Sequence, residues 1–98
     1  MRTIQEIFDL AIEVTFNGRY MCDALADLKT MDLITDEEHA SADEAIHSLL
    51  GGCFSLHNLI ARDQVTCWDK AFDRTAKVRY AIWRDWENRH QLIKEYLL

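Results

Sequence analysis

The sequence contains no proline and only three glycines among its 98 residues. Proline and glycine interrupt regular structure most strongly, and proteins built from many short strands depend on them at their turns. Their scarcity argues against a sheet protein with many turns and favours helices that are joined by short connections. Since 49% of the residues are hydrophobic, the chain has enough apolar surface for a folded core.

Cysteine is also sparse: Cys22, Cys53 and Cys67 are widely spaced, odd in number and without a CxxC pair. This pattern excludes the common cysteine motifs for zinc and does not suit a disulfide framework. No apolar run approaches the roughly 20 residues of a membrane-spanning helix, and the amino-terminal segment lacks the apolar character of a signal peptide. We therefore expect a cytoplasmic protein with reduced thiols, no membrane contact, and no metal or cofactor.

The whole chain has a formal net charge of −6, and its negative charge is concentrated in the first half. Residues 1–52 carry eleven acids and three bases, whereas residues 53–98 carry six acids and eight bases. Such a field can steer a basic protein to the acidic region, or bring two copies together with opposite charges in contact. Together with the aromatic content, it predicts a homodimer.

The acids of the second and third expected helices are predicted to form a partner-binding face. The alternative explanation of this acidic face is ordinary solubility. Its members are Asp27, Asp32, Asp36, Glu37, Glu38, Asp43 and Glu44.

Two segments, Thr3–Glu6 and Thr35–Glu38, have the spacing of a capping box, so each predicts the start of a helix. Apolar residues at helical spacing predict a first helix up to Asn17–Gly18, where glycine supplies the left-handed cap. The same spacing predicts further helices over about 20–31, 36–50, 56–62 and 70–87, with a break at Gly51–Gly52. A bend at Asn88–Arg89 precedes a short terminal helix. We predict a single all-α domain, residues 1–98, folded as a compact bundle of four to six short helices.

The stretch from Phe72 to Trp86 concentrates aromatic residues and basic charge. On a helical wheel, one arc of this stretch is apolar and predicts the main packing face, and Arg79 falls near its centre. The packing face consists of Phe72, Ala76, Ile82, Trp83 and Trp86, and a basic stripe on the other side consists of Lys70, Arg74, Lys77 and Arg84.

Arg79 allows two interpretations. As a structural residue, it pairs with an acid or lies over a tryptophan ring. As a functional residue, it binds a phosphate or carboxylate beside rings on which a base can stack. The second interpretation defines an alternative ligand site for a nucleotide or nucleic acid, formed by Arg79, Trp83, Arg84 and Trp86.

No Ser/His/Asp grouping, glycine-rich phosphate loop or paired carboxylate indicates catalysis, so we do not expect an enzyme. His39, Asp43 and His47 are spaced four residues apart, but the first and last diverge by about 80° around a helix. A zinc site needs three or four converging ligands. We therefore expect isolated histidines rather than a metal site.

Four short segments, Tyr20–Leu25, Leu33–Glu38, Ser48–Gly51 and Arg79–Trp86, resemble small all-helical accessory proteins of tailed bacteriophages. The resemblance implies expression in a bacterial cytoplasm during infection, where small acidic proteins often bind and block a host factor, including defence nucleases. It implies no functional residue. We therefore expect a protein-interaction module that inhibits or modulates a host protein, with nucleotide or nucleic-acid binding as the alternative.

Overall fold

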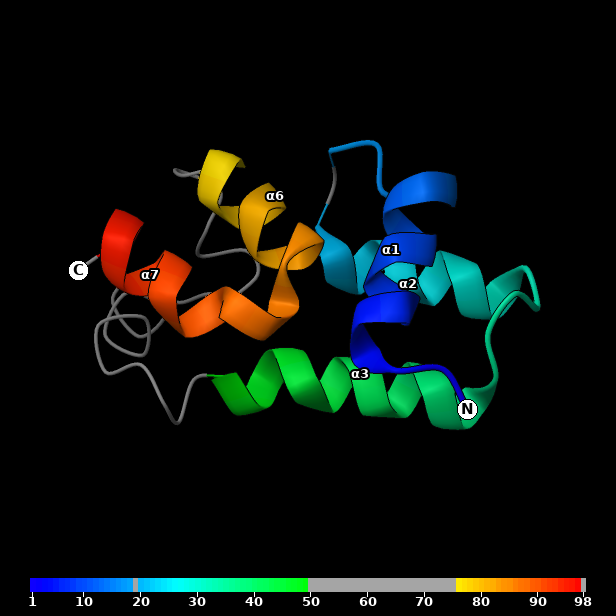
Figure 1. Ribbon diagram of the computed structural model, residues 1–98. Helices are drawn as coiled ribbons and strands as arrows, with labels where there is room; N and C mark the ends of the chain where they lie inside the picture. Colours follow the sequence, from blue (N-terminus) through cyan, green and yellow to red (C-terminus); the bar gives the residue numbers. More distant parts are fainter. Residues whose placement is uncertain (19, 50–75, 98) are drawn as a thin grey trace.

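The computed structural model describes residues 1–18, 20–49 and 76–97 of the chain. These residues form five α-helices, one 3-10 helix and no strand, which confirms the predicted all-α fold (Figure 1). In chain order the elements are α1 (Ile4–Val14), α2 (Met21–Thr30), α3 (Asp36–Ser48), α6 (Ala76–Arg84), the 3-10 helix η3 (Trp86–Asn88) and α7 (Arg89–Leu97). The predicted break at Gly51–Gly52, the predicted helix over 56–62 and Phe72 lie outside the described residues.

Both predicted capping boxes are present, and they start α1 and α3. Thr3 Oγ1 accepts a hydrogen bond from the Glu6 amide at 3.1 Å, while the Glu6 carboxylate accepts from the Thr3 amide at 2.9 Å. Thr35 and Glu38 make the same two bonds at 3.1 and 2.9 Å. Because each box satisfies amides that the first turn leaves without helical partners, both helices begin where the sequence predicts.

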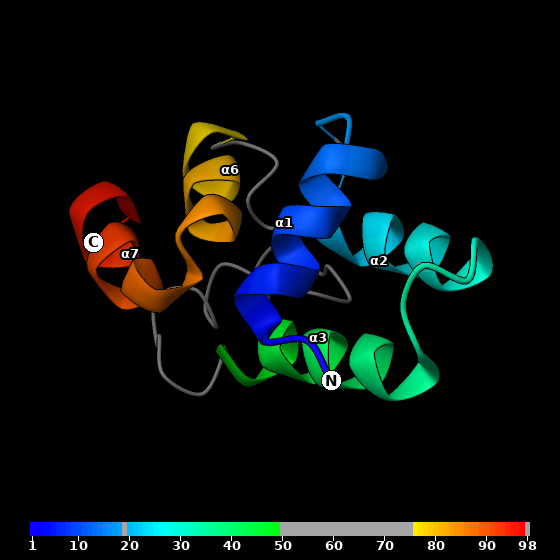
Figure 2. The ribbon, with the colours of Figure 1, turned by 45° about the vertical axis from the view of Figure 1, so that its right-hand side comes forward.

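Helix α1 lies at the centre of the described structure. It packs against α2, α3 and α6 and also contacts η3, whereas α7 packs on α6 and η3 (Figures 1 and 2). Figure 2 shows α1 between α6 on one side and α2 on the other, with α3 below them. The elements from the two ends of the sequence therefore share one core.

An aromatic cluster joins α1 to the α6–η3 segment. The ring centre of Phe8 lies 5.3 Å from that of Trp83 and 4.9 Å from that of Trp86, both in edge-to-face geometry. Ile82, Trp83 and Trp86 are buried, as is Phe8. Their burial confirms the predicted packing role of Ile82, Trp83 and Trp86. The edge-to-face contacts stabilise the cluster further, beyond the burial of apolar area.

The end of α6 differs from the prediction. The helix ends at Arg84 instead of continuing to Glu87, and Asp85 leaves helical geometry with φ −139° and ψ 65°. The backbone then forms η3 before α7 begins at Arg89. The break therefore lies before the predicted bend at Asn88–Arg89, at a position without proline or glycine.

Candidate functional site

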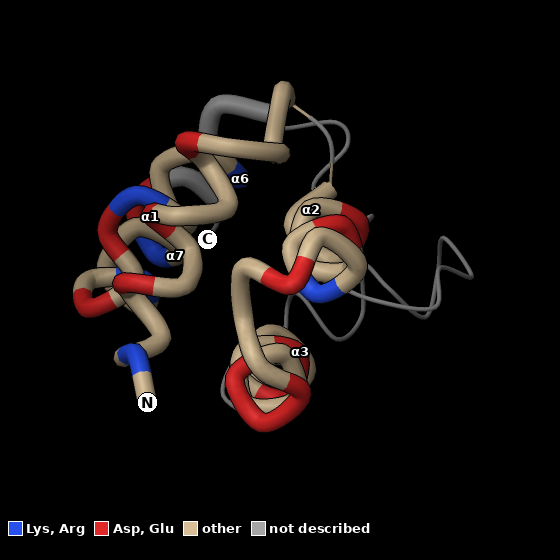
Figure 3. The backbone as a smooth tube through the Cα atoms, turned by 90° about the vertical axis from the view of Figure 1, so that its right-hand side faces the viewer, with Lys and Arg blue, Asp and Glu red and all other residues tan. Residues whose placement is uncertain are grey.

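The predicted acidic face follows α2, the connection after it, and α3. Figure 3 shows acidic positions around α3 and along the α2–α3 connection. Asp32, Asp36, Glu37 and Glu44 are exposed, whereas Asp27 and Asp43 are half-buried. The structure thus brings six of the seven predicted acids to the outer side of these elements. The lysine of α2, Lys29, lies 3.8 Å from the Asp36 carboxylate and neutralises little of this charge because both groups are solvated.

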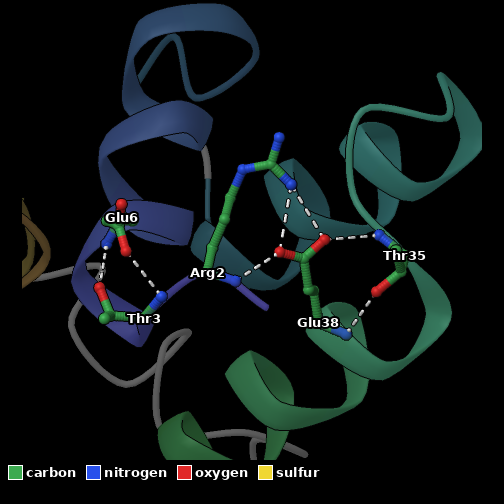
Figure 4. Close-up of polar contacts among 5 residues, drawn as sticks. All are labelled: Arg2, Thr3, Glu6, Thr35 and Glu38. Atoms are coloured by element: carbon green, nitrogen blue, oxygen red, sulfur yellow. Dashed lines mark hydrogen bonds and ion pairs between the residues drawn. The ribbon is translucent and has the colours of Figure 1, made fainter.

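Glu38, the seventh predicted acid, does not belong to the exposed face. Its side chain is 3% exposed and accepts hydrogen bonds from the Arg2 amide at 2.9 Å and from Arg2 Nη1 at 3.0 and 3.1 Å (Figure 4). The pKa of Glu38 is lowered to about 2. The largest cause is the hydrogen bond from the Thr35 amide, and the second is the hydrogen bond from the Arg2 amide. Its role is therefore to fasten the amino-terminal segment to α3, and the prediction that Glu38 is part of the exposed acidic face is wrong.

A shallow hollow of about 620 Å³ lies where the amino ends of α1 and α3 meet. The capping boxes mark both of these helix starts in the sequence, but the pairing of Arg2 with Glu38 spans 36 residues and has no local signal. Two of the wall carboxylates, Glu6 and Glu38, already accept the amides of the N-cap residues Thr3 and Thr35. With Arg2 also in the wall, the hollow combines both charges. The residues that line it are Met1, Arg2, Glu6, Thr35, Glu37 and Glu38.

Helix α2 ends in a Schellman motif that has an aspartate where glycine is usual. The Leu33 amide donates to the Leu28 carbonyl at 3.0 Å, and the Asp32 amide donates to the Lys29 carbonyl at 3.0 Å. Asp32 occupies the left-handed position of this motif, with φ 59°. The motif turns the chain sharply, and these two hydrogen bonds fix the backbone around Asp32.

The two neighbours of Asp32 are exposed apolar residues. Met31 is 53% exposed and Leu33 is 37% exposed, although both lie beside a well-formed helix end. The buried apolar residue of this connection is Ile34, which directly precedes the N-cap of α3 and packs in the core. The sequence marked the acids of this region but gave no sign that Met31 and Leu33 remain uncovered.

The alternative ligand site is not assembled as a surface. Trp83 is fully buried, and the 7% exposed Trp86 ring has the Arg89 guanidinium over it at 4.4 Å. Arg79 is also buried: its Nη2 donates to the Gly18 carbonyl at 2.9 Å, and its guanidinium lies 5.4 Å from the centre of the Tyr20 ring. Only Arg84, the fourth predicted residue, is exposed.

The contacts of Arg79 support its structural interpretation. Among the described residues, its guanidinium makes a cation–π contact with Tyr20, and a backbone carbonyl accepts its hydrogen bond. The carbonyl belongs to Gly18, which is in left-handed geometry at φ 74°. The prediction that Gly18 caps the first helix is wrong, because α1 ends at Val14 with Thr15 as its C-cap. Arg79 therefore ties α6 to the turn between α1 and α2.

Among the described residues, no group of three His, Cys, Asp or Glu side chains is placed to bind a metal ion. His47 instead contacts its own helix, with Nδ1 2.8 Å from the Asp43 carbonyl oxygen. None of the helices in the described ranges is long and apolar enough to cross a membrane.

No known protein family, curated protein or solved structure matches the chain. The resemblance to phage accessory proteins stays a prediction.

Proposed function

We propose that the protein acts by binding a basic protein partner through the connection between α2 and α3. The contact region, here called the α2–α3 surface, consists of Met31, Asp32, Leu33, Asp36 and Glu37. The observation that carries the proposal is the exposed apolar pair, Met31 and Leu33, in the middle of this acidic segment. An apolar centre with a charged rim is the usual anatomy of a protein interface, and methionine is enriched there.

The charge of the α2–α3 surface favours a basic partner. Asp32, Asp36 and Glu37 are exposed within six consecutive residues, and the described base that approaches them is Lys29. Complementary charge accelerates the encounter and orients the two proteins, while burial of Met31 and Leu33 supplies affinity after contact. A partner with basic residues around an apolar recess fits both requirements.

Asp32 supports the proposal because its position is unfavourable for stability. A non-glycine residue in left-handed geometry is strained, and a carboxylate at the carboxyl end of α2 lies at the negative pole of the helix dipole. Glycine would avoid both effects. A residue that is unfavourable in its own fold is a candidate for a function in binding.

A nucleic-acid-binding host protein is the class of partner that these features favour. Such proteins carry clustered lysine and arginine for contact with phosphates, so an acidic surface can occupy the same groups. We infer a phage-type accessory protein that inhibits or modulates a host factor, such as a defence nuclease complex, without an enzymatic activity of its own.

The test is affinity capture from a bacterial host lysate, followed by binding measurements with the recovered protein in purified form. Met31→Ser and the double charge reversal Asp32→Lys/Glu37→Lys are each expected to weaken binding by about tenfold or more. Glu38→Lys is unsuitable because it would disrupt the buried pair with Arg2.

The matched control is Glu13→Lys/Glu87→Lys, which makes the same charge change at two exposed acids on α1 and η3. This control is expected to bind as the unmodified protein does, apart from a small loss through net charge. Equal loss in both double variants would show that only overall charge matters. No loss in either would place the contact elsewhere on the molecule.

A further inference from the structure

The break between α6 and α7 is spanned by one side chain from the other end of the sequence, Gln5 of α1. Gln5 Oε1 accepts a hydrogen bond from the Trp86 amide at 2.6 Å. Gln5 Nε2 donates to the carbonyl of Trp83 at 3.0 Å and approaches that of Arg84 at 3.4 Å. A single amide group therefore contacts the backbone on both sides of Asp85.

These are the backbone groups that an uninterrupted helix would pair internally. In a continuous helix the Trp86 amide donates to the carbonyl four residues earlier, and the carbonyls of Trp83 and Arg84 accept from the amides of Glu87 and Asn88. Gln5 replaces both kinds of bond with its own acceptor and donor. The break thus leaves none of these three groups dependent on water alone.

The local sequence does not require the break. Residues 76–97 contain no proline or glycine, and their apolar residues continue at helical spacing past Asp85. Two short-range side-chain contacts support the bent form: Asn88 Nδ2 donates to Asp85 Oδ2 at 2.9 Å, and Arg89 Nη1 donates to the Trp86 carbonyl at 2.8 Å. The Asn88 amide also donates to the Asp85 carbonyl at 3.1 Å, in the 3-10 turn. Asn88 and Arg89 are compatible with a helix as well, so these contacts do not decide between the two forms.

We propose that the α6–α7 segment is a two-state element and that Gln5 selects its bent form. When the Gln5 bonds are lost, residues 76–97 form one continuous helix, and α7 moves away from α6. Because α7 buries Ile93 in the bent form, the continuous form uncovers apolar surface. The position of α7 is therefore set by the first turn of α1, at a place separate from the α2–α3 surface.

The test uses the full chain and the NMR carbon chemical shifts of Asp85, Trp86 and Glu87, which report backbone geometry residue by residue. In the unmodified protein, Asp85 is expected to show non-helical shifts. Gln5→Ala is expected to raise the population of the helical form on the order of tenfold or more, so that Asp85 moves toward helical values. Thr35→Ala weakens the fold at a distant helix cap and is expected to leave the Asp85 shifts unchanged.

Asn88→Ala keeps the experiment decisive if Gln5→Ala does not fold. It removes a local contact but leaves Gln5 in place, so the bent form is expected to persist. A helical Asp85 in Asn88→Ala would overturn the proposal, since a local bond would then be the lock. A folded Gln5→Ala protein with non-helical shifts at Asp85 would overturn it as well.

Discussion

Glu38 shows how a residue can look like a surface acid in the sequence and serve as a buried anchor. One carboxylate caps α3, accepts the Arg2 amide and pairs with the Arg2 guanidinium. These donors favour the charged form, which is the cause of the lowered pKa. These bonds hold the segment before α1 against the first turn of α3, as Figure 4 shows.

The first prediction concerns the acid dependence of stability. Because the pKa of Glu38 is about 2 in the folded protein and near 4.5 otherwise, its stabilising effect is fully present above pH 4.5. The effect is lost as the pH falls from 4.5 toward 2. Glu38→Gln is expected to lower the thermal unfolding midpoint at neutral pH, and the difference from the unmodified protein should shrink toward pH 2.

The control for Glu38→Gln is Glu37→Gln, which neutralises an exposed carboxylate in the same helical turn. Thermal unfolding followed by circular dichroism at several pH values measures both variants. Equal effects of the two substitutions, or a Glu38→Gln effect that does not change with pH, would contradict the role assigned to the buried pair.

The second prediction concerns Asp32. Asp32→Gly is expected to increase the free energy of unfolding by about 0.5–1 kcal/mol, since relief of the left-handed strain and of the dipole repulsion exceeds the entropy that glycine adds to the unfolded chain. Chemical denaturation measures this change. Asp32→Asn, which removes only the charge, should increase the free energy of unfolding by less. An Asp32→Gly protein that is less stable than the unmodified protein would refute the strain at this position.

Asp32→Gly also separates stability from binding. If the α2–α3 surface binds a partner, the same variant should be more stable and bind more weakly. A protein that gains stability without any loss of binding would show that Asp32 is outside the contact.

At the scale of elements, the sequence predicts the structure well where the signals are local. The capping boxes at Thr3 and Thr35 place two helix starts correctly, and helical spacing places α2 within its predicted range. The end of α6 could not be predicted, because Gln5 reaches it from about 80 positions away. The same limit applies to the candidate site, where Glu38 is buried by Arg2 and the exposure of Met31 and Leu33 depends on packing.

The third prediction concerns the packing of α1 against α6 and η3. Phe8→Ala is expected to lower the free energy of unfolding by about 3–5 kcal/mol, because the fully buried ring contacts both Trp83 and Trp86. Tryptophan fluorescence during denaturation measures the loss of free energy of unfolding. In the folded variant, the tryptophan emission should also shift to longer wavelength. Leu10→Ala, at a partly buried position of the same helix, is the control and should lose less.

At the scale of the whole molecule, the homodimer is predicted from the aromatic content and the charge contrast between the two halves, and the structure weakens the first of these two reasons. The aromatic rings of Phe8, Phe16, Trp83 and Trp86 are buried, so these rings do not supply an exposed contact face. Tyr80, at 46% exposure, is an exposed aromatic residue. The remaining ground is the charge contrast between the acidic α2–α3 region and the basic residues of α6 and α7.

The last prediction is that this contrast drives a salt-sensitive dimer. Sedimentation equilibrium at micromolar concentration and low salt should give twice the monomer mass of 11.5 kDa. Salt at about 1 M shortens the screening length from roughly 10 Å at 0.1 M to 3 Å, so it should dissociate the dimer. Glu37→Lys/Glu44→Lys should dissociate it at low salt, whereas Glu13→Lys, on α1 and outside both charged regions, should not. A monomer at low salt would exclude the homodimer, and a dimer that persists at high salt would require an apolar interface in place of the charged one.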